Sequence, residues 1–335
     1  MLKNEANLLP LDVSRHKKIA FIGPNAGISI ASGGGSSSLL AHYSTNPKDC
    51  FVEAVKGDSS IEISHAPGLL AHRYIPLIDP SIMTNPKTRE PGFFMEWWTN
   101  TKHEGNVIHT ENRPSSHLIC YDGLPPCLTT GDRYSYRATT ILTPKTSGLH
   151  TFSLSTCGPG KLILDDEVLL DIDRHANSPK SSLFMSYGSP EERIERKMEA
   201  GRSYKLVFQA VSREPKRQEF TYHGDMLREE IMDGGRVGFF EQVTANSFDE
   251  AIALARESDL VIVVVGRNNE WETETSDIIS MELPLDTNSL ISEVLKVNKN
   301  TVLVNQTGGP VSMPWIQEAS TVVQVCSTVN ISTRS

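Results

Sequence analysis

The sequence has no excess of positive charge and no long apolar run. Lys and Arg total 32 against 41 Asp and Glu, which gives a formal net charge of -9, and no apolar segment approaches the roughly 18–20 residues that a membrane-spanning helix needs. A chain without an overall cationic field is not expected to hold nucleic acid or an anionic lipid surface. We therefore expect a soluble globular protein with no nucleic-acid partner and no membrane partner.

Cysteine is scarce, and no two cysteines form a C-x-x-C pair. The five residues are Cys50, Cys120, Cys127, Cys157 and Cys326. This number and this spacing exclude a disulfide framework, and the odd count leaves at least one thiol free. Cys120 and Cys127 would close a small loop in an oxidising compartment, but we favour two unpaired buried thiols.

The first residues, Met1 to Asn7, carry neither the apolar core nor the small-residue cleavage site of a secretory signal. We therefore expect a cytoplasmic location by default, and a secreted one if the true amino terminus lies upstream of Met1. Localisation stays open at this point.

Motifs for a metal or a bound cofactor are missing as well. The ten histidines include no i, i+4 pair and no Cys–His cluster, so we expect no metal site. The glycine-rich run Ser32–Ser38 lacks the lysine of a P-loop, and we interpret it as flexible or closely packed backbone. It does not fit the G-x-S-x-G turn of a nucleophilic serine either. We expect no cofactor.

Apolar periodicity gives both ends of the chain an α/β character. The expected strands are 19–22, 261–265, 301–304 and 322–325. Unbroken β-branched runs such as 261–265 suit strands that are buried on both faces of a parallel sheet. A helix is expected to begin at the capping box Ser247–Glu250, and a second one carries Leu290, Ile291, Val294 and Leu295 at helical spacing. These elements alternate as βαβ units.

The middle of the chain, residues 86–243, alternates with a period of two and is interrupted by turn residues. The expected strands are 136–142, 149–155, 161–164, 168–172 and 204–211. This pattern predicts an all-β sandwich inserted into the α/β domain. The predicted organisation is residues 1–85 and 244–335 as the two parts of the α/β domain, the second truncated, with 86–243 as the insert.

Two features of the middle segment have alternative interpretations. Phe93, Phe94, Trp97 and Trp98 are dense enough to form a sugar-binding platform, but we favour core or junction packing. The pair Asp165-Asp166 is either a tight hairpin turn or a sugar-binding edge, and we favour the turn.

An acidic loop follows the strongest expected strand. Glu270, Glu272, Glu274 and Asp277 lie within eight positions, together with Trp271. Ligands bind at the carboxyl ends of parallel strands, and crowded carboxylates raise one another's pKa, so that one acid stays protonated near neutral pH. The general acid of glycoside hydrolysis needs this property, and an aromatic face such as that of Trp271 stacks on sugars. The alternative is a solvated acidic loop without chemistry.

The motifs together resemble glycoside hydrolase family 3, of the fungal β-glucosidase type that carries a protective-antigen-like insert. The resemblance covers nearly the whole chain without the family's amino-terminal catalytic barrel. The matching segments are 2–11, 19–26 with 32–36, 143–152 with 199–204, 259–274 and 305–315. The resemblance implies an α/β-sandwich domain, with a mostly parallel sheet of βαβ units, interrupted by an inserted all-β sandwich.

The resemblance also implies roles for residues of the acidic loop. Glu274 corresponds to the general acid/base, with Glu272 as second choice, and Trp271, Asp277 and Arg267 are expected to bind substrate. The glycine, aromatic and arginine that follow the acid/base in the family are here replaced by residues 275, 276 and 278. The aspartate nucleophile of the family lies on the barrel, which this chain lacks.

Three functions remain open from the sequence. The first is a partial or degenerate β-glucosidase that would hydrolyse terminal β-D-glucosyl residues by a retaining mechanism. The second is a non-catalytic carbohydrate-binding or interaction protein, and the third is a glycosidase-like protein recruited to another reaction on a small metabolite. The expected ligand is a β-glucoside or another small glycosylated molecule, and the expected protein partner is a barrel-bearing chain or a second copy.

Overall fold

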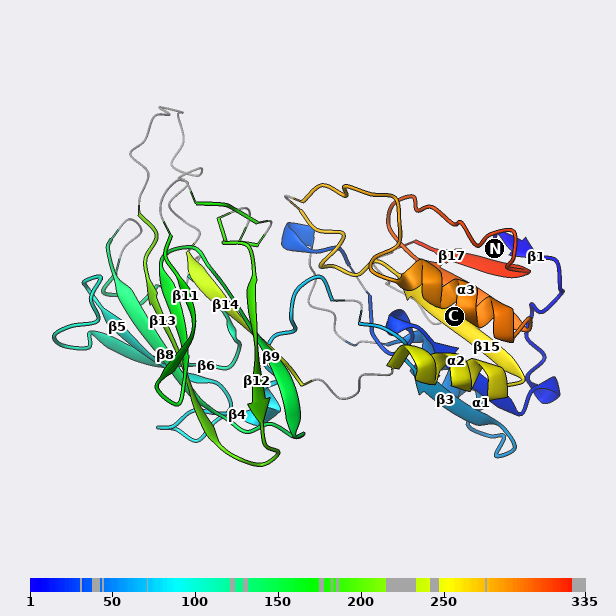
Figure 1. Cartoon of the computed structure of the whole chain (residues 1–335), viewed down its shortest axis with the longest axis horizontal. Helices are drawn as coiled ribbons and strands as arrows, with labels where there is room; N and C mark the ends of the chain where they lie inside the picture. Colours follow the sequence, from blue (N-terminus) through cyan, green and yellow to red (C-terminus); the bar gives the residue numbers. More distant parts are fainter. Residues whose placement is uncertain are drawn as a thin grey trace. The chain divides into compact units, whose positions relative to one another are not determined.

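The computed structural model describes residues 1–30, 32–37, 43, 45–70, 72–120, 124–128, 132–174, 178–181, 183–184, 187–214, 233–241, 247–274 and 276–326. The chain divides into two compact units (Figure 1). The α/β unit comprises residues 1–73 and 244–335, and the β unit comprises residues 74–243. The β unit therefore interrupts the α/β unit in sequence.

A mostly parallel sheet forms the centre of the α/β unit. Its strand order is β1-β17-β16-β15-β2-β3, and only the pairing of β1 with β17 is antiparallel among these strands. The strands are β1 (Lys3–Asn4), β2 (Lys18–Ile22), β3 (Glu62–Ala66), β15 (Leu260–Gly266), β16 (Thr301–Gln306) and β17 (Thr321–Val325). The expected strands at 19–22, 261–265, 301–304 and 322–325 are thus confirmed.

Alternate residues of the central strand β15 serve two apolar cores. Val261, Val263 and Val265 share one core with α2 (Ser247–Glu257) and α3 (Thr287–Val297). Ile262 and Val264 belong to a second core that Phe51 of α1 (Pro47–Val55) joins. Burying each such side chain stabilises the fold by roughly 1.5–3 kcal/mol. The sheet is therefore covered on both faces, which explains why the strand is apolar without a break.

The start of α2 differs from the sequence expectation. The capping box places Ser247 before the first turn, whereas the structure includes Ser247 in the helix. Its hydroxyl donates to the carbonyl oxygen of Gly68 (3.2 Å). The prediction of a helix at this place is confirmed, and its first residue is Ser247 itself. The residues just before the helix, 242–246, lie outside the described residues.

The β unit consists of two antiparallel sheets. The larger has the order β11-β10-β13-β8-β5-β6, with β4 pairing with β8, and the smaller has the order β12-β9-β14-β7. The strands are β4 (Met83–Thr84), β5 (Phe93–Trp98), β6 (His109–Arg113), β7 (His117–Ile119), β8 (Ser135–Leu142), β9 (Gly148–Thr156), β10 (Gly160–Leu164), β11 (Glu167–Ile172), β12 (Glu192–Met198), β13 (Tyr204–Val211) and β14 (Gly234–Glu241). All five strands expected in the middle segment are confirmed.

The two sheets of the β unit share one apolar core. Trp97 and Phe208 come from the larger sheet, and Phe152 and Phe239 from the smaller one. Phe93, Trp97 and Trp98 are buried, so the packing interpretation is confirmed for these three. Phe94 is half-buried, and Lys87 Nζ lies 6.0 Å from its ring centroid.

The turn interpretation of Asp165 and Asp166 is also confirmed. Both residues have positive φ, of 47° and 72°, in the tight turn that joins β10 to β11. Aspartate tolerates this left-handed conformation better than most residues do, because its short side chain can form local hydrogen bonds.

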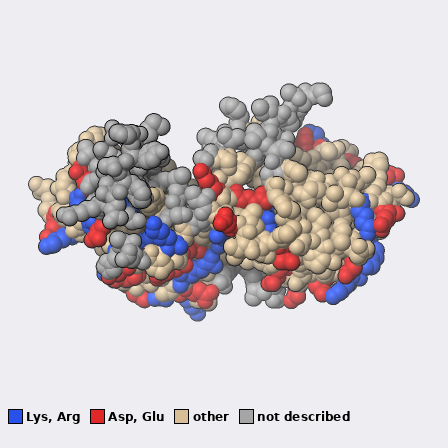
Figure 2. All heavy atoms as spheres, turned by 90° about the horizontal axis from the view of Figure 1, so that it is seen from above, with Lys and Arg blue, Asp and Glu red and all other residues tan. Residues whose placement is uncertain are grey.

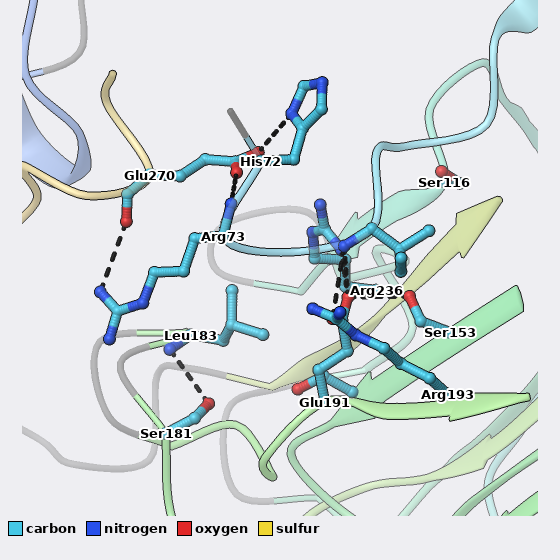
Figure 3. A network of polar contacts seen from close by, with 12 residues as sticks. His72, Arg73, Ser116, Ser153, Ser181, Leu183, Glu191, Arg193, Arg236 and Glu270 are labelled. Carbon is cyan, nitrogen blue, oxygen red and sulfur yellow. Dashed lines mark hydrogen bonds and ion pairs between the residues drawn. The ribbon is translucent and has the colours of Figure 1, made fainter. Parts of the chain in front are cut away.

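A buried ion cluster holds the beginning of the β unit. The Glu191 side chain is only 4% exposed and pairs with Arg236 (3.1 Å) and Arg193 (2.7 Å). Ser153 Oγ and the backbone N–H of Ile75 also donate to Glu191 Oε1, at 2.8 and 3.0 Å (Figure 3). The carboxylate thus fixes the segment that leads into the β unit against its smaller sheet.

The cysteines form no disulfide in the described part of the chain, where all five thiols are free. Cys120 is buried, as expected, but Cys127 is exposed. The expectation of two buried thiols is therefore wrong for Cys127, which lies in a turn whose apolar contact is made by Leu128.

Charges are mixed on the surface that Figure 2 shows, where acidic and basic side chains are interspersed. Among the helices of the described residues, none has both the length and the apolarity needed to cross a membrane.

Candidate functional site

The acidic loop begins at the carboxyl end of the central strand β15, where Gly266 is required by a close approach of two backbones. A Cβ at Gly266 would lie 1.8 Å from the carbonyl oxygen of Gln306, at the end of β16. The adjacent backbone N–H of Arg267 donates to the same oxygen (2.9 Å). The loop therefore leaves the sheet directly beside the segment that follows β16, at the edge where parallel sheets bind ligands.

The glycine-rich run packs against this acidic loop. The backbone N–H of Gly34 donates to the carbonyl oxygen of Glu272 (2.8 Å), and Gly34 forms a β-bridge with Thr273. A Cβ at Gly35, where φ is +71°, would lie 2.6 Å from Cβ of Glu274. Of the two interpretations, flexible or closely packed backbone, the contacts of Gly34 and Gly35 support close packing, while residue 38 of the run lies outside the described residues. Its partner, the acidic loop, could not be identified from the sequence.

Glu272 is engaged in bonds within the site. Its carboxylate accepts hydrogen bonds from the backbone N–H groups of Gly308 (2.8 Å) and Gly309 (3.3 Å), which follow β16. Arg267 Nη1 lies 4.0 Å from Glu272 Oε1. Such charge-assisted bonds hold a carboxylate firmly, and the Glu272 side chain is only 14% exposed. Glu272 therefore joins the acidic loop to the loop after β16.

Arg267 was expected to bind substrate, but its side chain is buried inside the loop. Its side chain is 3% exposed, and its guanidinium donates to the carbonyl oxygens of Ser280 (2.8 Å) and Glu282 (3.2 Å). These bonds connect the first residue of the loop with its far end.

Arg73 and Glu270 link the acidic loop to the end of the 1–73 segment (Figure 3). The backbone N–H of Arg73 donates to Glu270 Oε2 (2.7 Å), and His72 Nδ1 lies 3.6 Å from Glu270 Oε1. Arg73 Nη1 donates to Ser276 Oγ (2.7 Å), and its guanidinium lies 5.8 Å from the ring centroid of Trp271.

Three predicted site residues remain accessible. Glu274 and Asp277 are exposed, and Trp271 is half-buried. Residue 275, which replaces the glycine of the family pattern, lies outside the described residues. All five predicted residues thus lie in one loop. Three of them are reached by solvent, whereas the side chains of Glu272 and Arg267 are engaged in contacts with neighbouring backbone.

The sequence reasoning missed Arg73 and the pair Gly308–Gly309. Arg73 carried no local signal, because it lies 203 residues from Ser276. The two glycines follow directly after an expected strand, and their place at the carboxyl end of that strand was the available signal. Within the described residues, no group of three His, Cys, Asp or Glu side chains gathers as a metal site would require.

Comparison with known proteins gives consistent matches. The profile of the glycosyl hydrolase family 3 C-terminal domain matches residues 1–330. The chain is 32% identical to the probable beta-glucosidase I of Emericella nidulans over 333 residues, and 32% identical to beta-glucosidase B of the same fungus over 330 residues. Each match covers 97% of this chain and 37% of the relative.

A solved structure agrees with these matches. The beta-glucosidase of Kluyveromyces marxianus, in complex with glucose, superposes with a TM-score of 0.79 at 28% identity, over 97% of this chain and 38% of that one. The chain thus spans little more than a third of the relatives that it matches. On the profile match and the identity to the fungal enzymes, the chain belongs to glycoside hydrolase family 3.

Proposed function

We propose that the chain provides the proton-donating side of a β-glucosidase site, with Glu274 as the acid/base. In retaining hydrolysis, one carboxylic acid protonates the leaving glycosidic oxygen while a carboxylate attacks the anomeric carbon and forms a glycosyl-enzyme. The first residue, now a carboxylate, then takes a proton from water, and this water cleaves the glycosyl-enzyme with net retention. The attacking carboxylate would come from the barrel that family members carry outside this region.

The accessibility of Glu274 is the observation that carries this proposal. The Glu274 side chain is exposed at the carboxyl edge of the parallel sheet. Glu272, by contrast, is tied to Gly308, Gly309 and Arg267. A general acid must reach the glycosidic oxygen within hydrogen-bond distance, and an exposed carboxyl meets this need better than one that already holds two loops together.

The other predicted residues take roles that suit their positions. Trp271 and Asp277 are reachable and are proposed to contact the sugar, since an aromatic face stacks on a pyranose ring. Arg267 and Glu272 are proposed to support the loop from inside. The ligand would be a β-glucoside or another small glycosylated molecule, and the nucleophile would come from a barrel-bearing chain, or from a barrel in a longer form of this one.

For the β unit, we propose an inserted sandwich of the protective-antigen type. The range 86–243 expected from the sequence lies within residues 74–243 of this unit, and residues 1–73 and 244–335 would be the two parts of an α/β sandwich. The shared core of its two antiparallel sheets supports this assignment. So does the return of the chain to the α/β unit after residue 243.

The test is the hydrolysis of an aryl β-glucoside by two forms of the protein. One is the 335-residue chain, and the other is an exchange chimera, in which the matched region of Emericella nidulans beta-glucosidase B is replaced by this chain. We expect turnover by the chimera and none by the chain alone. Glu274→Gln is expected to lower kcat of the chimera about 100-fold or more, in line with the loss of general acid catalysis.

Glu272→Gln is the matched control, because it removes a neighbouring charge of the same loop. It is expected to lower activity less than Glu274→Gln does and to weaken the α/β unit more. Turnover that Glu274→Gln leaves unchanged would refute the proposal.

A second candidate is a non-catalytic sugar-binding protein. It is favoured by one specific observation, because the half-buried Trp271 offers the acidic loop an aromatic ring that can stack on a sugar without any chemistry. Glucose binding by the isolated chain, together with a folded chimera that has no turnover, would favour this candidate over the first.

A further inference from the structure

Arg73 contacts the acidic loop on both sides of Glu274. Its Nη1 donates to the carbonyl oxygen of Glu270 (3.4 Å) and to Ser276 Oγ (2.7 Å). Glu270 precedes Glu274 by four positions, and Ser276 follows it by two. One guanidinium therefore bridges the two flanks of a short segment that contains the proposed acid.

The backbone of the same residue adds a second attachment. The N–H of Arg73 donates to Glu270 Oε2 (2.7 Å), while His72 lies 3.6 Å from the other oxygen of that carboxylate. Glu270 is itself 23% exposed, so that the carboxylate is sheltered from water for the most part. Hydrogen bonds to a charged partner are stronger than those between neutral groups. Both the backbone and the side chain of Arg73 are therefore hydrogen-bonded to the loop.

The guanidinium also lies over the proposed sugar-stacking ring. Arg73 Cζ is 5.8 Å from the centroid of Trp271, within the range of a cation–π contact. Arginine suits this place better than lysine, because its planar fork can stack on an aromatic ring while its N–H groups donate sideways.

We propose that Arg73 is a positioning residue for Glu274, a role that rests on the proposed function of Glu274 as the acid/base. By tying Glu270, Trp271 and Ser276 to one side chain, Arg73 removes backbone freedom from the segment between them. The Glu274 carboxyl is then presented within reach of the glycosidic oxygen before substrate arrives. Arg73 itself touches neither substrate nor the reacting atoms.

The first experiment measures the loop without relying on activity. Both measurements use the 335-residue chain. Acrylamide quenching of the Trp271 fluorescence is obtained by subtracting the signal of the matching Trp271→Phe protein. Amide hydrogen exchange is followed over residues 270–277. Arg73→Ala is expected to raise the quenching constant of Trp271 about twofold and to speed exchange in the loop. Arg73→Lys is expected to restore part of the protection, because the charge and one donor remain.

Arg256→Ala is the matched control, because Arg256 is an exposed arginine in the last turn of α2, away from the loop. It is expected to change neither quenching nor exchange. Unchanged Trp271 quenching and unchanged loop exchange in Arg73→Ala would overturn the proposal. If Arg73→Ala fails to fold, Ser276→Ala cuts the distal contact alone, and the same two readouts then decide.

The second experiment separates this proposal from the proposed function. In the exchange chimera, kcat/KM is measured for aryl β-glucosides whose leaving groups differ in acidity. Loss of proton donation harms a poor leaving group more than an activated one, so Glu274→Gln should steepen this dependence. Arg73→Ala should steepen it in the same direction, with about a tenfold loss on the poorest leaving group.

The two failures can be told apart. An Arg73→Ala chimera that loses the same factor on every leaving group, beside a Glu274→Gln chimera with the steepened dependence, contradicts the role of Arg73 alone. A Glu274→Gln chimera without steepening contradicts the proposed function itself, and the quenching and exchange data still decide whether Arg73 holds the loop.

Discussion

Gly34 and Asn269 lie so close together that a Cβ at Gly34 would stand 2.1 Å from the carbonyl oxygen of Asn269. The same Cβ would meet Thr273 Oγ1 at 2.5 Å. The glycine-rich run and the acidic loop, more than 230 residues apart in sequence, therefore form one packed structure. The shape of the candidate site depends on the absence of side chains in this run.

Gly34→Ala is accordingly expected to displace the acidic loop. The carbonyl oxygen of Asn269 is a backbone atom and cannot move aside as the end of a flexible side chain can. We therefore expect the α/β unit to lose about 1–3 kcal/mol of stability. Thermal unfolding and loop hydrogen exchange measure the effect. Gly57→Ala is the control, because a Cβ there meets nothing within 4 Å. Equal stability of the two variants would contradict the tight packing.

Removing the buried carboxylate of Glu191 is expected to destabilise the β unit strongly. Glu191→Ala removes the carboxylate that pairs with Arg236 at 3.1 Å, and the Arg236 side chain is only 7% exposed. Breaking one side of a buried ion pair costs about 3–5 kcal/mol. Glu199→Ala is the control, since Glu199 is 71% exposed and pairs with Arg202 at the surface, where such pairs contribute roughly 0–1 kcal/mol. A denaturant titration that shows similar losses for both variants would refute the prediction.

His117 is expected to make the β unit sensitive to acid. Burial, and next the charge of Arg236, lower the pKa of His117 to about 4 from the usual 6.5. Because the folded-state pKa lies below the unfolded-state pKa, the stability contribution is complete above pH 6.5 and is lost as the pH falls through about 4. His117→Phe should reduce this acid sensitivity, because phenylalanine does not titrate. The site can hold an aromatic ring, since the ring centroids of His117 and Phe184 lie 5.1 Å apart.

The direct measurement for this residue is an NMR titration of the His117 ring protons. A midpoint near 4 in the folded protein agrees with the burial of the imidazole. A midpoint at the usual value of 6.5 would show that the ring is hydrated, and the predicted acid sensitivity would then have another origin.

The central strands could be predicted because their burial leaves a strong mark on the sequence. β15 is covered on both faces, so all its residues are apolar apart from the closing Gly266, and β13 alternates as a strand with one buried face does. The turn at Asp165–Asp166 was favoured over a sugar-binding edge, because aspartate is common in tight turns, and both residues have the positive φ of such a turn.

Other elements left too weak a mark. β12 is largely charged and was not anticipated, because among the strands that the structure describes it lies at the edge of its sheet beside β9, and it buries little besides Met198. The helix α1 buries none of its residues fully, so its apolar period is faint. Its Asn46–Pro47 start, with Asn46 accepting from the backbone N–H of Asp49, was the signal that could have located it.

For the site, the sequence identified the loop but not its supports. The spacing of Glu270, Glu272, Glu274 and Asp277 indicated the acidic loop, whereas nothing local distinguished an accessible carboxyl from one that holds the loop. That distinction comes from Gly308 and the glycine-rich run, which reach the loop only after the sheet has assembled. Contacts between segments far apart in sequence thus determine which carboxylates of the loop are exposed and which are held.

The role of Glu274 can be tested most directly by rescue with a nucleophile. Glu274→Gly in the exchange chimera removes the base that activates water, so the glycosyl-enzyme of an activated aryl β-glucoside should accumulate. Azide attacks without needing proton removal. The account predicts that added azide speeds turnover at least about tenfold and yields a β-glucosyl azide. Hydrolysis at the unmodified chimera's rate, or a slow rate that azide does not change, would contradict it.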